Sequence, residues 1–255
     1  MQTIVLATQK GGSGKSTLAI GLALAAMQEG HTVRLIETDP QGTLSNWKKR
    51  RLDAEPGVEP VETAHDIEQR LEIFERNGVT LTVIDTAGGI SDVTTAAIRA
   101  ADLCLIPVRP SLADLEAATP TLWLARACKT PFGFVLNQTP VRGQRLDNAS
   151  SALDQGVLPA ADSGVAQPFI VMRNDHQDAL GGGLAVTEYA PHGKSAEEIR
   201  GLWQWVTGKL GPVARADARG VVFDPAAPDT VPTMFPLTEQ EAMATAPAAS
   251  ELGRF

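Results

Sequence analysis

Eight consecutive residues near the start of the chain have the types and spacing needed to hold a phosphate chain. They run from Lys10 to Thr17 and read KGGSGKST, between an apolar run and an Ala/Leu-rich segment. Backbone N–H groups of such a loop turn inward around phosphates, and the helix that follows adds its partial positive charge. Lys15 would reach the β- and γ-phosphates, and the Ser16 hydroxyl would ligate Mg²⁺. The expected nucleotide contacts are Gly11, Gly12, Ser13, Gly14, Lys15, Ser16 and Thr17.

Acidic side chains end two other apolar runs. Glu37 and Asp39 close the segment Leu35-Ile36-Glu37-Thr38-Asp39, and Asp85 closes Leu81–Asp85, 70 residues after Lys15. Strands of a parallel sheet present their carboxyl ends at one edge, so the three carboxylates should lie beside the loop. Alternation along a strand predicts that Glu37 and Asp39 both face the γ-phosphate and the attacking water, unless they only cap the turn. Asp85 would hold a magnesium-bound water.

The elements that must position these residues follow from the hydrophobic pattern. From residue 3 to about residue 210, short apolar runs alternate with longer segments of helical period. This pattern predicts an α/β fold, doubly wound, with helices on both faces of a mostly parallel sheet. The expected strands are 3–8, 32–36, 81–85, 103–108, 132–137 and 167–171. The expected helices are 16–29, 43–53, 65–77, 92–101, 112–128, 145–155 and 195–210.

Composition sets the remaining limits. The chain has 255 residues, 43% of them hydrophobic, and a formal net charge of -8, so any DNA contact requires a local basic patch. Two isolated cysteines, Cys104 and Cys128, predict buried free thiols in a cytoplasmic protein. We find no signal peptide and no transmembrane run. We expect a P-loop domain over 1–211 and, because 212–255 holds six of the 17 prolines, an extended tail there.

Three segments resemble the ParA/MinD superfamily of deviant Walker-type P-loop ATPases. They are the K-G-G-x-G-K-[ST] loop, the D-P-Q turn at 39–41, and Ile106-Pro107-Val108-Arg109-Pro110-Ser111 with Asp114. Segments 43–47 and 183–189 are similar to the small, plasmid-borne ParA proteins represented by ParF, which lack an N-terminal helix-turn-helix. The resemblance covers residues 2 to about 210.

The resemblance implies roles for single residues. Lys10 would reach across an ATP-dependent homodimer to the partner's nucleotide, Lys15 would bind phosphates, and Asp39 would position the attacking water. Asn137 would contact adenine, although a strand-end turn former is the other interpretation. Glu37 stands where the family usually has Asp, so its expected place near the magnesium shell, with Ser16 and Asp85, is open.

The implied function is a Mg²⁺-dependent ATPase that binds nucleoid DNA nonspecifically and is stimulated by a ParB-like adaptor. Its cargo would be a plasmid, a chromosome or a protein cluster. Two alternatives are a MinD-like membrane-positioning ATPase, which the proline-containing acidic tail disfavours, and a dethiobiotin-synthetase-like ligase. A second basic cluster, Lys48 to Arg51, would either bind DNA or be the solvated face of a helix. The main expected DNA contacts are Arg142, Arg145, Arg173, Arg200 and Lys209.

Overall fold

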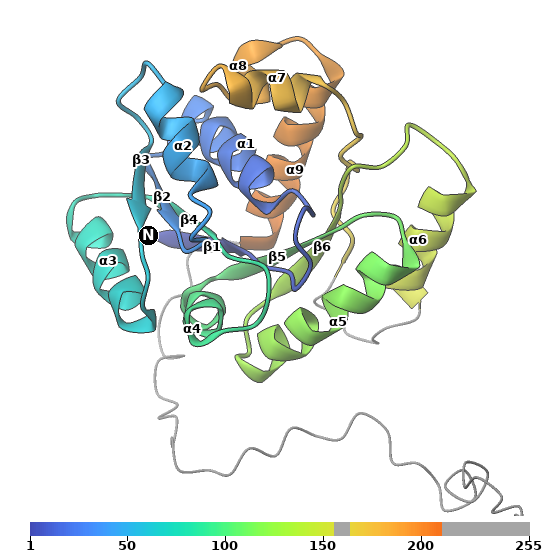
Figure 1. Cartoon of the computed structure of the whole chain (residues 1–255), viewed down its shortest axis with the longest axis horizontal. Coiled ribbons are helices and arrows are strands. Elements are labelled where there is room, and N and C mark those ends of the chain that lie inside the picture. Colours follow the sequence, from blue (N-terminus) through green and yellow to red (C-terminus); the bar gives the residue numbers. More distant parts are fainter. Residues whose placement is uncertain (156–163, 211–255) are drawn as a thin grey trace, which may run out of the picture. The chain divides into compact units, whose positions relative to one another are not determined.

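A six-stranded parallel sheet organises the part of the chain that the computed structural model describes, residues 1–155 and 164–210 (Figure 1). The strand order is β3-β2-β4-β1-β5-β6, and every neighbouring pair is parallel. The strands are β1 (Gln2–Leu6), β2 (Val33–Glu37), β3 (Gly57–Pro60), β4 (Leu81–Asp85), β5 (Leu103–Val108) and β6 (Phe132–Leu136). The expected doubly wound α/β fold is confirmed.

Helices cover both faces of the sheet (Figure 1). One face packs against α1 (Lys15–Gln28), α2 (Thr43–Arg50), α8 (Val186–Tyr189) and α9 (Lys194–Leu210). The other packs against α3 (Ala64–Arg76), α4 (Asp92–Ala100), α5 (Leu112–Ala127) and α6 (Gln144–Gln155). A short helix, α7 (Asp175–Gly181), lies between the end of the sheet and α8 in the sequence.

Alternation along the strands divides the core into two layers. Ile4 and Leu6 of β1 belong to the layer under α1 and α9, whereas Val5 belongs to the layer under α3 to α6. All three side chains are fully buried, because the central strands of a parallel sheet are covered on both sides. Trp47 and Trp203 are fully buried in the first layer, so they are packing residues of the core.

The structure corrects several expected elements. Residues 167–171 do not form a strand: only isolated bridges join Phe134 to Val165 and Thr139 to Val171. Pro168 has no N–H for a continuous ladder. Strand β3 and helices α7 and α8 were not expected, and α2 ends at Arg50 rather than residue 53.

Other expectations have different outcomes. Cys104 is buried, but Cys128 is only half-buried, so the prediction of two buried thiols is wrong for Cys128. Among residues 1–155 and 164–210, no helix is both long and apolar enough to cross a membrane. The expected tail at 212–255 lies outside the described residues.

Candidate nucleotide-binding site

The sequence motifs meet at the carboxyl edge of the sheet. The glycine-rich loop follows β1, Glu37 ends β2, Asp85 ends β4, Arg109 follows β5 and Asn137 follows β6. In the paired strands β2 and β4, Glu37 lies directly opposite Asp85. Because all these strands run in one direction, five segments that are far apart in the sequence contribute to one site.

The glycine-rich loop leads directly into α1. Gly14 is the N-cap of this helix with φ 92°, and Gly12 has φ 73°. Both values lie in the left-handed region that favours glycine. The first residue of α1, Lys15, is only 6% exposed. Burial lowers the pKa of Lys15, and the nearby carboxylates of Asp85 and Asp39 partly oppose that shift. The buried ammonium at this helix start favours an anionic ligand.

Asp85 is the least satisfied charged group of the site. Its side chain is 0% exposed, and within the described part of the chain neither carboxylate oxygen accepts a well-formed hydrogen bond. Burial raises the pKa of Asp85 to about 7, although the Ser16 hydroxyl and Lys15 favour the charged form. A buried carboxylate that accepts no well-formed hydrogen bond and lies close to a serine hydroxyl fits a divalent cation with oxygen ligands. Asp85 and Ser16 are therefore able to hold Mg²⁺ together with phosphate oxygens.

The structure does not turn Glu37 toward the phosphates together with Asp39. The buried Glu37 carboxylate accepts hydrogen bonds from the backbone N–H of Leu44 at 2.6 Å and of Ser45 at 3.1 Å, and from the Ser45 hydroxyl. These are the second and third N–H groups of α2, whose N-cap residue Gly42 offers no side chain. Glu37 therefore caps α2 from the end of β2.

Asp39 lies in the loop between β2 and α2 and is half-buried. Its Oδ1 accepts the Gln41 N–H at 3.0 Å, and its charge raises the pKa of Lys15. The loop after β4 approaches the glycine-rich loop from the other side. A Cβ at Gly88 would lie 3.3 Å from the carbonyl oxygen of Gln9, so a larger residue would press on that backbone.

Lys10 forms an ion pair within the chain. Its Nζ donates to Asp114 Oδ2 at 2.9 Å, while Arg109 Nε donates to Asp114 Oδ1 at 2.9 Å. The Ser111 hydroxyl also donates to Asp114, whose backbone N–H is in turn capped by Ser111. Burial would raise the pKa of Asp114, but hydrogen bonds from Ser111, Arg109 and Lys10 outweigh it and lower the pKa. The sequence did not indicate this contact, since 104 residues separate Lys10 from Asp114.

Asn137 and Gln138 contact the glycine-rich loop. Asn137 Nδ2 donates to the Ser13 carbonyl at 2.7 Å, and Gln138 Nε2 donates to the Gly12 carbonyl at 3.0 Å. The expected contact of Asn137 with adenine stays a prediction. Gln138 was not singled out in the sequence, because no local pattern distinguishes it from an ordinary loop glutamine.

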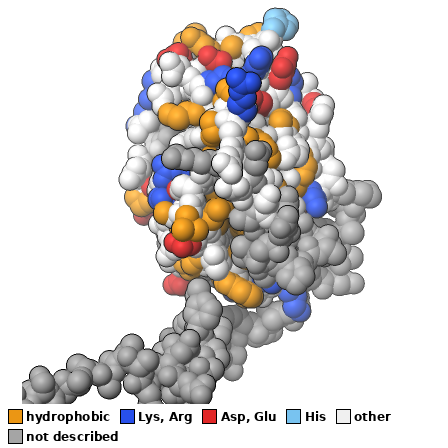
Figure 2. Space-filling view, turned by 90° about the vertical axis from the view of Figure 1, so that its right-hand side faces the viewer, with side chains coloured by type: hydrophobic (Ala, Val, Ile, Leu, Met, Phe, Trp, Pro, Cys, Tyr) orange, Lys and Arg blue, Asp and Glu red, His pale blue; other side chains and the backbone are white. Residues whose placement is uncertain are grey.

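The expected DNA-binding residues do not share one environment. Arg173 forms an ion pair with Glu198 at 2.6 Å, Arg200 donates to the Pro191 carbonyl, and Lys209 lies over the Trp205 ring. Arg142 is exposed, and the side chain of Arg145 is not among those that the structure describes. On the face shown in Figure 2, Lys and Arg side chains of the described part are dispersed among acidic and apolar ones. Their role in DNA binding stays a prediction.

The second basic cluster divides between solvent and core. Lys49 and Arg50 are exposed, as a solvated helix face requires, but Arg51 is buried. The Arg51 guanidinium forms two hydrogen bonds with Glu188, at 2.7 and 2.8 Å. The interpretation of this run as one surface cluster is therefore wrong for Arg51.

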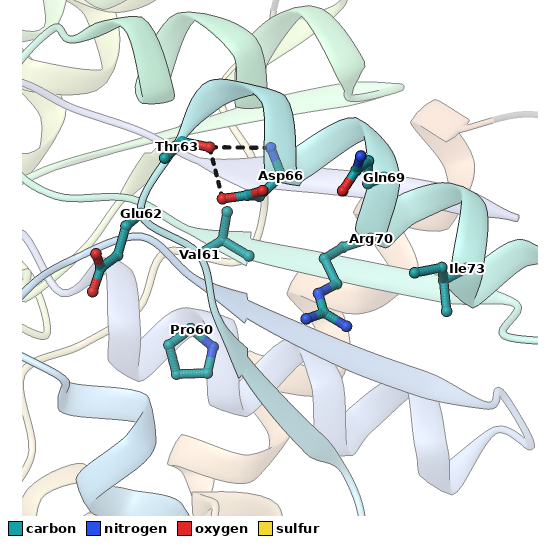
Figure 3. Close-up of a pocket in the computed structure, with 8 residues that line it drawn as sticks. All are labelled: Pro60, Val61, Glu62, Thr63, Asp66, Gln69, Arg70 and Ile73. Carbon is teal, nitrogen blue, oxygen red and sulfur yellow. Dashed lines mark hydrogen bonds between the residues drawn. The ribbon is translucent and has the colours of Figure 1, made fainter.

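A hollow of about 420 Å³ lies away from the motifs, between the end of β3 and the first turns of α3 (Figure 3). Two of its polar residues form hydrogen bonds with each other. The Thr63 hydroxyl accepts the Asp66 N–H, which caps α3, and donates to Asp66 Oδ2 at 2.6 Å. Arg70 lies 3.9 Å from Glu59. This hollow lacks the unpartnered buried charge that distinguishes the carboxyl edge of the sheet. It is lined by Pro60, Val61, Glu62, Thr63, Asp66, Gln69, Arg70 and Ile73.

The motifs and their geometry agree with comparisons to known proteins. The family described as "CobQ/CobB/MinD/ParA nucleotide binding domain" matches residues 4–153, which span the glycine-rich loop, Asp39, Asp85, Asp114 and Asn137. This match covers more than half of the chain.

Relatives extend the similarity. Maintenance of carboxysome distribution protein A from Halothiobacillus neapolitanus is 28% identical over 204 residues, covering 77% of this chain and 91% of that protein. Protein ParA from Rhizobium radiobacter is 30% identical over 128 residues, covering 49% and 56%. The solved structure of the septum site-determining protein MinD from Pyrococcus horikoshii, complexed with Mg-ADP, has a TM-score of 0.64 at 16% identity, covering 82% and 97%. At that identity the last likeness concerns the fold.

Proposed function

Since the chain belongs to the CobQ/CobB/MinD/ParA nucleotide-binding family, we propose that it is a Mg²⁺-dependent ATPase that switches between a monomer and an ATP-bound dimer. The observation that carries this proposal is the buried Lys15 at the start of α1 with the buried Asp85, at the end of β4, near it. A cation at a helix start, beside a buried carboxylate that accepts no well-formed hydrogen bond, suits a triphosphate and its metal ion.

Each residue of the site has a part in this proposal. Lys15 binds the β- and γ-phosphates, and Ser16 and Asp85 hold Mg²⁺, which neutralises charge on the phosphate oxygens when it is bound. Asp39, placed between β2 and α2, orients the attacking water. Glu37 fixes the start of α2 and thereby the loop that carries Asp39.

Lys10 supplies the link to a second subunit. We propose that it leaves Asp114 and reaches the nucleotide bound by the partner. The Lys10 side chain is 34% exposed, so its ion pair with Asp114 is partly screened by solvent. After Lys10 leaves, Asp114 still accepts hydrogen bonds from Arg109 and Ser111, so the buried carboxylate keeps two donors.

The dimer is proposed to bind nucleoid DNA nonspecifically and to position a cargo with a ParB-like adaptor. Supporting this, the relatives named above include a protein of carboxysome distribution and a ParA. The proposed cargo is a plasmid, a chromosome or a protein cluster. We also propose that the protein groups with the small, ParF-like ParA proteins.

Two substitutions test the switch. Lys15→Ala should weaken ATP binding at least about 100-fold, because it removes a charge-assisted contact to the phosphates. Lys10→Ala should keep ATP affinity within a few-fold but lose ATP-dependent dimerisation, measured by size-exclusion chromatography with light scattering. Lys49→Ala, on the exposed face of α2, is the control. A Lys10→Ala chain that dimerises normally with ATP would refute the role across the interface.

DNA and membrane binding are separated by cosedimentation with DNA and with liposomes, each with and without ATP. DNA binding should require ATP and weaken steeply with salt, because phosphate contacts release counterions. Charge reversal at Arg200 and Lys209 should lower DNA affinity in the ATP state. Reversal at Arg173, which Glu198 already neutralises, should have a smaller effect on DNA binding. ATP-dependent binding to liposomes instead of DNA would favour the MinD-like alternative.

A further inference from the structure

Two side-chain amides from the end of β6 hold consecutive carbonyl groups of the glycine-rich loop. Asn137, which is 5% exposed, donates from Nδ2 to the Ser13 carbonyl at 2.7 Å. Gln138 donates from Nε2 to the Gly12 carbonyl at 3.0 Å. The two residues are also joined to each other, because the Gln138 N–H donates to Asn137 Oδ1 at 2.9 Å. This contact spans 124 residues of sequence.

Peptide geometry gives the contact a consequence for phosphate binding. In a planar trans peptide the C=O of one residue and the N–H of the next point in opposite directions. When Gln138 draws the Gly12 carbonyl outward, the Ser13 N–H must point the other way. When Asn137 draws the Ser13 carbonyl outward, the Gly14 N–H does the same. Backbone N–H groups of this loop are the donors that cradle phosphates.

We infer that Asn137 and Gln138 are positioning residues that preorganise the glycine-rich loop for the phosphate chain. This inference rests on the proposed function, since it assigns a role within the nucleotide site. Preorganisation raises affinity because the loop does not have to be ordered when the ligand binds.

Two features of the backbone support this role. Gln138 has φ 52°, a value that is unfavourable for a residue with a Cβ. The other such residue in the described ranges, Lys129 at φ 58°, directly follows the C-cap of α5, where left-handed residues are common. Gln138 does not follow a helix, so a helix end does not explain its positive φ. Its side chain instead donates to the Gly12 carbonyl.

The fit at Gly14 is the second feature. A Cβ at Gly14 would lie 2.2 Å from Asn137 Nδ2, so the amide occupies the space that any other residue would need. A glycine at position 14 is therefore needed twice: for the left-handed N-cap of α1 and for the close approach of the Asn137 amide.

An adenine contact by Asn137 and a brace of the loop make different predictions. Loss of an adenine contact weakens ATP but leaves a ligand without a base unaffected. Loss of the brace weakens both by the same factor, because both depend on the loop N–H groups. The probes are therefore Mg-ATP and Mg-tripolyphosphate, each measured by displacement of a fluorescent ATP analogue.

The variants Asn137→Leu and Gln138→Met remove the donors with little change in size and without adding charge. Each should weaken both ligands about 3- to 10-fold, the effect of one hydrogen bond, with an unchanged ratio between them. Gln138→Gly relieves the positive φ but also removes the donor, so it should lose the same affinity without a lower melting temperature. Gln204→Met, at an exposed position of α9, is the control and should bind like wild type.

The outcomes separate the inference from the proposed function. A wild-type chain that binds neither ligand refutes the proposed function and with it this role. If wild type binds and Gln138→Met and Asn137→Leu bind both ligands equally well, the brace alone is refuted. Loss of ATP affinity with tripolyphosphate unaffected would assign Asn137 to adenine and overturn the brace there. Because Gln138 is only half-buried, its variants keep the test valid if Asn137→Leu fails to fold.

Discussion

Two buried charges in this molecule have opposite surroundings. Arg51, with a side chain 2% exposed, follows α2 and uses all five guanidinium N–H groups. Two go to Glu188, and one each goes to the Glu55 carbonyl, the Gly183 carbonyl and Asp53. Asp85, at the end of β4, accepts no well-formed hydrogen bond within the described part of the chain.

We interpret the difference as that between a structural charge and a charge that binds a ligand. Leaving a buried charge without partners costs free energy, and a fold retains it where something else supplies the partner. Arg51 has its partners within the chain and joins α2 to α8, whereas Asp85 lies near Lys15 and would, in the proposed function, bind a metal ion. Removing the charge should therefore destabilise the protein at Arg51 and stabilise it at Asp85.

Arg51→Met should give the largest effect. It leaves the Glu188 carboxylate with the Ala185 N–H but without its cation, and it removes the Arg51 donors from two carbonyl groups. We therefore expect the free energy of unfolding to fall by about 3 to 5 kcal/mol, measured by urea denaturation. The double variant Arg51→Met/Glu188→Met should recover part of this loss, because the one carboxylate left without Arg51, that of Asp53, is exposed to solvent. If Arg51→Met alone unfolds at the wild-type urea concentration, the bonds around Arg51 are not what stabilises this region.

Asp85→Asn should have the opposite sign. The raised pKa of Asp85, about 7, means that the folded chain binds more protons than the unfolded chain between about pH 4 and 7. The stability of the nucleotide-free protein therefore falls as pH rises through this range and levels off above it. At pH 8, Asp85→Asn should be more stable than wild type by about 2 to 4 kcal/mol, and this advantage should shrink as pH falls toward 4.

Asp114→Asn is the matched control for Asp85→Asn. Both carboxylates are buried, but the pKa of Asp114 is lowered, so its contribution to stability is present above pH 4 and is lost as pH falls. Asp114→Asn should destabilise the protein at pH 8. Asp85→Asn should also lose the rise in melting temperature that Mg-ATP gives to wild type. A destabilised Asp85→Asn protein at pH 8 would show that the carboxylate has partners in the fold.

The sequence predicts those features that have a local signal and misses those that depend on contacts between distant residues. Strands β4 and β5 have the expected bounds, because a continuous apolar run suffices for a central strand. Strand β3, with the sequence GVEP, has no such run and depends on its pairing with β2. The glycine-rich loop has a strong local signal, and the signal for Asp85 comes from an apolar run placed 70 residues after Lys15. The bonds from Asn137 to Ser13 and from Arg51 to Glu188 join residues 124 and 137 positions apart, so only the folded chain reveals them.

Glu37 lies between the two extremes, and its substitution should have the smallest effect of the three. Its carboxylate is buried and partnered like Arg51, but it stands opposite Asp85 at the site. Glu37→Gln turns an NH₂ group toward N–H groups of α2, and Glu37→Asp withdraws the carboxylate by one methylene. Both should lower the free energy of unfolding by about 1 to 2 kcal/mol, the worth of a helix cap, with nucleotide absent.

The alternative is that Glu37 acts in the magnesium shell. In that case Glu37→Gln would lower ATP hydrolysis and its Mg²⁺ dependence without changing the stability of the nucleotide-free protein. Ser45→Ala is the matched control, since it removes one donor to Glu37 without altering the acidic group. If Glu37 is the cap, Ser45→Ala should reproduce part of the destabilisation, and the Mg²⁺ concentration for half-maximal hydrolysis should stay as in wild type. Because Leu44 and Ser45 already occupy both Glu37 oxygens, we expect the cap to prevail.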